Sequence, residues 1–156
     1  MCMAGWGCGS ISDVMDAATP HRMDIRVYYE DTDFSGVVYH ASYLRFLERG
    51  RTELLRALGI HQAAIHTGAA GAAFAFAVRA MQIDFRRPAV MDDVVRVETR
   101  ATAVGGASVE LAQRISRGPD VLVTAQVRVA VVAGGKAARL PKAVRAVLLS
   151  HLVTAP

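Results

Sequence analysis

The chain contains little cysteine and no long apolar run. Its two cysteines, Cys2 and Cys8, lie at the very start of the sequence. A disulfide framework therefore does not hold the domain, and two thiols so placed match no metal-ligand spacing. No window reaches the roughly 18 apolar residues that a membrane-spanning helix needs. The start also lacks the basic residues and compact apolar run of a secretory signal. We expect a cytoplasmic protein with no transmembrane segment and no metal.

Runs of one charge sign are absent as well. The 18 basic and 14 acidic residues give a formal net charge of +4, but the basic residues are scattered and aromatics make up 6% of the chain. Nucleic-acid binding proteins instead gather Lys and Arg into patches, interleaved with aromatics where single strands stack. We therefore expect no nucleic acid as a partner. Two enzyme signatures are missing too, the Gly-x-Ser-x-Gly nucleophile elbow and the Gly-x-Gly-x-x-Gly dinucleotide loop.

What the sequence does contain is enough apolar residues for one core. At 156 residues, 53% of them hydrophobic, the chain makes one ordinary domain and is too short for two. Residues 1–21 carry glycines and serines without any period, which predicts a flexible N-terminal extension. The domain itself is expected over residues 22–150.

The central pattern is a strand, a loop and a long helix. Residues 25–29 alternate as a strand exposed on one face does. Helical spacing follows up to Gly59, which can turn left-handed and end the helix while Ile60 packs back on its last turn. The predicted apolar face of the helix consists of Leu44, Leu47, Leu54, Leu55 and Leu58, and the predicted polar face of Arg45, Glu48, Arg49, Thr52 and Arg56.

Strands dominate the rest of the chain. An Ala- and Gly-rich connector is expected over 62–71, and a short helix over 141–149. Between them, Gly105-Gly106 and the turn at 117–120 separate alternating segments. We predict four long strands in a meander, at 74–85, 94–104, 108–116 and 121–132. A helix with an apolar face followed by this much sheet indicates an α+β domain whose antiparallel sheet curls round the helix.

The loop before the helix carries the candidate chemistry. Asp31, Asp33 and Gly36 lie between the strand and the helix N-terminus, where unpaired N–H groups and the helix dipole favour a developing oxyanion. Gly36 lets a substrate approach the backbone closely. A carboxylate facing such a site is the minimum equipment for attack on an acyl carbonyl. The same residue types also cap turns and helices, and spacing alone leaves both interpretations open.

A family resemblance rests on residues 30–54, which read Glu-Asp-Thr-Asp-Phe-Ser-Gly-Val-Val-Tyr-His-Ala-Ser-Tyr-Leu-Arg-Phe-Leu-Glu-Arg-Gly-Arg-Thr-Glu-Leu. This stretch resembles the signature of the hot-dog acyl-CoA thioesterases, within them the YbgC type. That type is associated with the Tol–Pal cell-envelope system and related to 4-hydroxybenzoyl-CoA thioesterase. The resemblance implies a long central helix wrapped by a five-stranded antiparallel sheet. It also implies a homodimer or homotetramer with the acyl site at the subunit interface.

The same resemblance assigns roles to residues of the loop and helix. Asp33 is the catalytic carboxylate, as nucleophile or general base, and the backbone N–H of His40 polarises the thioester carbonyl. The substrate-binding candidates are Gly36, Val37, Tyr39, Tyr43 and Glu48. Glu48 is a reserve catalytic candidate, and its alternative role is a structural contact with Arg45 or Thr52. Ser35 stands where the family often has a second glycine, a change that narrows the expected acyl pocket.

The implied substrate is an acyl-CoA, or an acyl chain on acyl carrier protein, hydrolysed without a cofactor. Scattered arginines and lysines could meet the phosphates of coenzyme A, but the sequence does not say which. Two alternatives remain open at this point. One is a hot-dog dehydratase or hydratase acting on acyl-thioesters, and the other is a non-catalytic domain that binds acyl-CoA.

Overall fold

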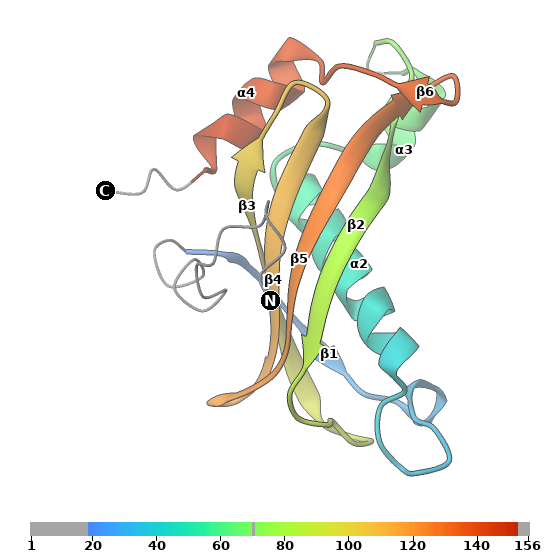
Figure 1. Cartoon of the computed structure of the whole chain (residues 1–156), viewed down its shortest axis with the longest axis vertical. Helices are drawn as coiled ribbons and strands as arrows, with labels where there is room; N and C mark the ends of the chain where they lie inside the picture. The colour runs from blue at the N-terminus through green and yellow to red at the C-terminus, as the bar shows by residue number, and fades with distance from the viewer. Residues whose placement is uncertain (1–18, 70, 153–156) are drawn as a thin grey trace, which may run out of the picture.

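The computed structural model describes residues 19–69 and 71–152. Most of the predicted extension, residues 1–18, lies outside this range. A curled antiparallel sheet wraps the long helix α2, as Figure 1 shows. In chain order the elements are β1 (His21–Arg26), the 3-10 turn η1 (Tyr29–Asp31), α2 (His40–Ala57), α3 (Gln62–Thr67), β2 (Ala75–Phe85), β3 (Val94–Val104), β4 (Ser108–Arg117), β5 (Asp120–Ala133), β6 (Lys136–Ala137) and α4 (Lys142–Ser150).

The order of strands in the sheet is β1-β3-β4-β5-β2, and the two-residue β6 pairs with β5. The five expected strands and the α+β hot-dog layout are confirmed, with β6 as a small addition. The predicted four-strand meander is wrong, because β2 crosses over to pair with β5 and forms the far edge of the sheet. Alternation in sequence predicts which face of a strand is buried and says nothing about its neighbours.

One irregularity interrupts the β2 ladder. The pairing of β2 with β5 shifts register between Val78 and Ala80, so Arg79 has no opposite residue. Such a bulge bends its strand and strengthens the local twist. The free side of β2 forms one edge of the sheet in the described part of the chain, along the same side of the molecule as α2 (Figure 1).

Helix α2 turns a different face to the sheet than predicted. Leu47 and Leu54 are buried as expected, but Leu44 is 40% exposed, and Tyr43 and Phe46 are buried in its place. Gly50 explains the close fit, since a Cβ at this position would lie 2.7 Å from Val97 Cγ1. The helix approaches the sheet at Gly50, which fixes the rotation of α2 and brings the aromatic residues inward.

The two ends of α2 agree with the sequence. The helix begins at His40, the residue whose backbone N–H the resemblance assigns to the thioester carbonyl. After its last turn Gly59 adopts φ +77°, and the Ile60 N–H donates to the Leu55 carbonyl at 2.8 Å with Ile60 buried. This is the left-handed ending that the glycine indicated.

Two boundaries differ from the sequence predictions, and one agrees with them. The connector expected over 62–71 contains the helix α3, which ends at the left-handed Gly68. Strand β1 stops at Arg26, because the chain turns at η1 and leaves Tyr28 and Tyr29 exposed. The C-terminal helix α4 is confirmed, with Leu148 buried beneath it. None of the helices in the described residues is both long and apolar enough to span a bilayer.

Candidate active site

The loop between η1 and α2 is held by its own backbone. The Asp33 N–H donates to the Val37 carbonyl at 2.9 Å, and the Gly36 N–H donates to the Asp33 carbonyl at 3.0 Å. Gly36 adopts φ +83°, a conformation that disfavours any side chain. Its missing Cβ would meet nothing within 4 Å. The backbone at Gly36 is therefore open to a molecule approaching from outside.

A second segment, residues 86–93, supports this loop from the side. The Val38 N–H donates to the Ala89 carbonyl at 2.8 Å, and Val37 forms an isolated bridge with Val90. The sequence analysis missed this segment. Its one signal is Pro88, which ends the β2 pattern, and a proline does not say where the following loop will pack.

Asp33 presents an exposed carboxylate. The Ser35 hydroxyl and the Ser35 N–H both donate to Asp33 Oδ1, the N–H at 2.8 Å. The Ser35 hydroxyl bond is the main cause that holds the pKa of Asp33 below its ordinary value. Backbone N–H groups of Ser35 and Val37 and the nearby charge of His40 act in the same direction, and partial desolvation opposes them. Asp33 is therefore ionised at neutral pH and available to act on a substrate.

Asp31 has a structural place in the same loop. It is 6% exposed, and its Oδ2 accepts a hydrogen bond from the Tyr28 N–H at 2.9 Å. Its carbonyl accepts from the Tyr39 N–H at 2.9 Å. A carboxylate tied to the turn in this way shapes the loop and does not face a substrate.

The start of α2 leaves two N–H groups open. Tyr39 and Ser42 donate to backbone carbonyls, whereas the N–H groups of His40 and Ala41 form no backbone hydrogen bond within residues 19–69 and 71–152. The first N–H groups of a helix lack intrahelical acceptors and point to where the dipole favours negative charge. The N–H of His40 can therefore stabilise an oxyanion, in keeping with the role that the resemblance assigns to it.

Aromatic rings surround this helix start. The His40 ring lies 4.4 Å from the Tyr39 ring, centroid to centroid, and 6.4 Å from that of Phe85. Tyr43 is buried, and its hydroxyl accepts a hydrogen bond from the Ala89 N–H at 2.9 Å. Burial raises the pKa of the Tyr43 phenol, so it stays protonated. Tyr43 thus braces the supporting segment, while the half-exposed Tyr39 faces outward.

Glu48 does not join the Asp33 loop. It lies two turns along α2, where Oε2 accepts from Arg51 Nη2 and Oε1 accepts from the Thr52 hydroxyl, both at 2.9 Å. The expected contact with Thr52 is present, but the charged partner is Arg51 and not Arg45. The sequence analysis missed Arg51, which is 7% exposed and also donates to Gln113 at 2.9 Å.

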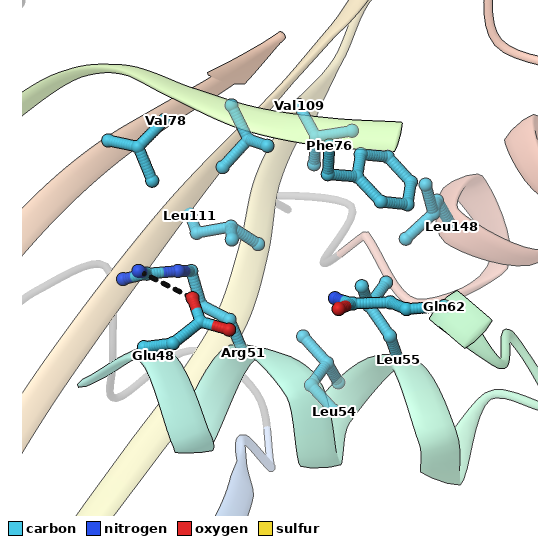
Figure 2. A pocket seen from close by; sticks show the side chains of 11 residues that line it. Glu48, Arg51, Leu54, Leu55, Gln62, Phe76, Val78, Val109, Leu111 and Leu148 are labelled. Carbon is cyan, nitrogen blue, oxygen red and sulfur yellow. Dashed lines mark hydrogen bonds and ion pairs between the residues drawn. The ribbon is translucent and has the colours of Figure 1, made fainter. Parts of the chain in front are cut away.

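The Glu48–Arg51 pair lines a cavity between α2 and the sheet. Figure 2 shows this pair with Val78 at one end and Phe76, Gln62 and Leu148 at the other. The cavity has a volume of about 80 Å³. The structure thus separates an exposed carboxylate loop at the start of α2 from a largely apolar cavity farther along it. No cluster of three or more metal-ligating side chains gathers in the part of the chain that the structure describes.

Comparison with known proteins identifies the family. Residues 27–148 match the model of the thioesterase-like superfamily. The chain is 45% identical over 124 residues to the acyl-CoA thioesterase YbgC of Haemophilus influenzae, covering 78% of this chain and 89% of that protein. It is 43% identical over 105 residues to the acyl-CoA thioester hydrolase YbgC of Escherichia coli, covering 67% and 75%.

Solved structures agree with these sequences. A probable thioesterase from Bartonella henselae superposes with a TM-score of 0.76 at 46% identity, covering 78% of this chain and 99% of that one. A 1,4-dihydroxy-2-naphthoyl-CoA thioesterase from Synechocystis superposes with a TM-score of 0.73 at 25% identity, covering 82% and 94%. With its hot-dog fold, the chain belongs to the thioesterase-like superfamily and, within it, to the YbgC type.

Proposed function

We propose that this protein is an acyl-CoA thioesterase, which hydrolyses the thioester of an acyl-CoA to a free acid and coenzyme A. The observation that carries this proposal is that an exposed, ionised Asp33 carboxylate and an open His40 N–H both occur where the loop meets the start of α2. The YbgC relatives are named for the same reaction. The chemistry needs a carboxylate and an oxyanion site and no metal.

In this mechanism the thioester carbonyl oxygen accepts a hydrogen bond from the His40 N–H. Asp33 then either attacks the carbonyl carbon or takes a proton from a water molecule that attacks it. Negative charge gathers on the carbonyl oxygen and is stabilised by the positive end of α2. Collapse of the tetrahedral intermediate expels the thiolate of coenzyme A. When Asp33 itself attacks, loss of the thiolate leaves a mixed anhydride between the acyl group and Asp33, and water then hydrolyses this anhydride to the free acid and the Asp33 carboxylate.

The neighbouring loop residues bind the substrate. Gly36 has no side chain in the way and turns its backbone outward, which lets the thioester lie against the loop. Val37 is held by its bridge to Val90 and Tyr39 packs on the His40 ring, so both border the position of the carbonyl. Tyr43 acts from behind by bracing Ala89.

The active protein is a dimer, alone or paired into a tetramer. The β2 edge is unpaired in the described structure, and Val78 and Phe85 on this strand are 49% and 46% exposed. A long edge strand with exposed apolar side chains is a template for pairing with a second copy. A single-chain mass in solution at micromolar concentration would contradict this assembly.

The Asp33→Asn variant tests the proposed function. The substitution keeps the size of the side chain and removes the charge that drives attack. We expect kcat to fall by on the order of 10² to 10⁴ while KM changes little, because the substrate is bound mainly by other groups. Release of free thiol from a panel of acyl-CoAs measures both constants.

Asp31→Asn is the matched control in the same loop. Because Asp31 is buried and holds the Tyr28 N–H, this variant should lower the melting temperature and cost far less kcat. If Asp33→Asn keeps more than about a tenth of the wild-type kcat, the catalytic assignment is wrong. Glu48→Gln would then be the next variant to measure.

A further inference from the structure

Two cavities lie end to end beneath α2 and α3. The outer cavity, of about 80 Å³, is the one between α2 and the sheet. The inner cavity, of about 170 Å³, lies under α3 and is lined by Gln62, Ile65, His66, Phe74, Ala75 and Phe76. Gln62 and Phe76 line both cavities. These two side chains therefore form the wall between them.

The outer cavity is apolar inside and charged at one end. Its walls come from aliphatic side chains of α2, β4, β5 and α4, namely Leu54, Leu55, Val109, Leu111, Val129 and Leu148. Figure 2 shows the Glu48–Arg51 pair beside Val78, at the end away from Phe76. The Val78 side chain is half exposed at the β2 edge, and so is that of Glu48. In the single chain the cavity therefore opens at the β2 edge, and the proposed dimer places this opening at the subunit interface.

The charged groups at this end already have partners. Arg51 bonds to Glu48 and to the buried Gln113, so its guanidinium is satisfied without a bound molecule. An occupant of the cavity thus gains little from charge and much from burying its own apolar surface. That preference fits a hydrocarbon tail.

The wall at the far end is held in place. The Phe76 ring meets the Phe74 ring edge to face, with centroids 5.5 Å apart and planes at 81°. Phe76 also packs against the hydrophobic core. Aromatic pairs in this geometry stabilise each other beyond their buried area. Phe76 is therefore a fixed part of the wall, whereas Gln62 is exposed on α3 and contributes the outer half.

We infer that the outer cavity takes the terminal carbons of an aliphatic acyl chain, and that Phe76 with Gln62 sets the length of chain that fits. This inference rests on the proposed thioesterase activity and adds its substrate class. A cavity of about 150 Å³ holds a benzene ring. By that scale the outer cavity holds about three carbons and no ring, and the inner cavity has room for about six more.

The test compares chain-length profiles. Wild type and Phe76→Ala are assayed for kcat/KM on straight-chain acyl-CoAs from acetyl to palmitoyl and on benzoyl-CoA. Removing the ring joins the two cavities, so the preferred chain should lengthen by about four carbons or more. Relative to the wild-type optimum, the longer chains should gain about tenfold or more. Wild type should prefer its best straight chain over benzoyl-CoA.

Two further variants test the same inference in case Phe76→Ala does not fold. Gln62→Ala opens the wall from the exposed side at little risk to the fold, and should lengthen the preferred chain by a smaller amount. Phe74→Ala removes an equal ring from the inner cavity and keeps both side chains of the wall, although Phe76 loses its ring contact with Phe74. The chain-length profile of Phe74→Ala should therefore shift less than that of Phe76→Ala, even though its melting temperature falls.

The outcomes separate this inference from the function on which it rests. An active enzyme whose optimum stays fixed in both Phe76→Ala and Gln62→Ala overturns the chain-length assignment alone. An equal lengthening in Phe74→Ala also overturns it, because general loosening would then explain the shift. A wild-type preference for benzoyl-CoA overturns the aliphatic class. Failure of wild type to hydrolyse any acyl-CoA overturns the proposed function itself.

Discussion

The two halves of α2 hold their functional groups by different means. At the start of the helix, Asp33 sits in a loop fixed by backbone hydrogen bonds and is exposed. Farther along, Arg51 sits in a network of side chains, with Gln113 fully buried beneath it. The loop thus presents an exposed carboxylate with hardly any core around it. The second half instead uses the core to shape a cavity.

This difference predicts how each half responds to mutation. The exposed Asp33 side chain can change while the backbone bonds of the loop remain, so the proposed chemistry should be lost while stability is kept. A side chain in the network supports several others, so its loss reaches the core. Asp33→Asn and the following variant should therefore give opposite results in turnover and stability.

The largest expected effect on stability is that of Gln113→Leu. The Gln113 amide donates to the Leu47 carbonyl and to Thr99 Oγ1, each at 2.8 Å, and accepts from Arg51. Leucine would remove all three bonds and leave the buried guanidinium with Glu48 alone. We expect the free energy of unfolding to fall by about 3 kcal/mol, measured by urea denaturation.

The control is an ion pair on the surface. Arg87 Nη1 bonds to Asp120 Oδ1 at 2.6 Å, but its side chain is 61% exposed. Arg87→Ala should cost less than about 1 kcal/mol. A Gln113→Leu variant that loses kcat as severely as Asp33→Asn, with its stability intact, would break the distinction between the two halves of α2.

A smaller effect is expected from changing Ser35, whose hydroxyl bonds to the Asp33 carboxylate. Ser35→Ala removes the hydroxyl bond that most strongly lowers the pKa of Asp33, so this pKa should rise toward its ordinary value. In the proposed mechanism Asp33 acts in its ionised form, so we expect activity to be lost as pH falls through its pKa. The acid limb of kcat/KM should therefore move to higher pH in Ser35→Ala, with turnover at neutral pH nearly unchanged.

Thr32→Ala serves as the comparison for this profile. The Thr32 hydroxyl donates to the Tyr29 carbonyl at 2.7 Å and not to Asp33. Its removal should leave the acid limb where it is in wild type. An acid limb that stays in place in Ser35→Ala, or moves to lower pH, would show that Ser35 does not set the charge of Asp33.

Local features of the sequence predicted much of this structure. The end of the helix at Gly59 and the hairpin at Gly105-Gly106 depend on backbone preferences that adjacent residues carry, and the resemblance placed the helix start at His40. The rotation of α2 about its axis was harder to predict from the sequence. Tyr43 and Leu44 are adjacent, and helical spacing is compatible with either of them as the buried residue. Contact with the sheet at Gly50 decides between them.

Contacts between residues that lie far apart in the chain could not be predicted from the sequence. Gln113 lies 62 residues from Arg51, and nothing near either residue indicates their hydrogen bond. Ala89 supports the Asp33 loop through Val38, again across a long separation. The Asp33 and His40 assignments came from a resemblance over one continuous stretch, and they remain proposals. The cavity wall could not be predicted either, because its two residues, Phe76 and Gln62, come from different elements that meet only in the fold.

The bulge at Arg79 also affects how newly synthesised chains avoid aggregation through their exposed β2 edges. A flat, eleven-residue edge would accept any extended strand and would invite aggregation during synthesis. The bulge between Val78 and Ala80 twists the edge and interrupts its even row of hydrogen-bonding groups. In the proposed dimer a second copy of β2 carries the same interruption, so the two edges can match along their length. We therefore expect the bulge to disfavour pairing of this edge with strands of other proteins or with misaligned copies.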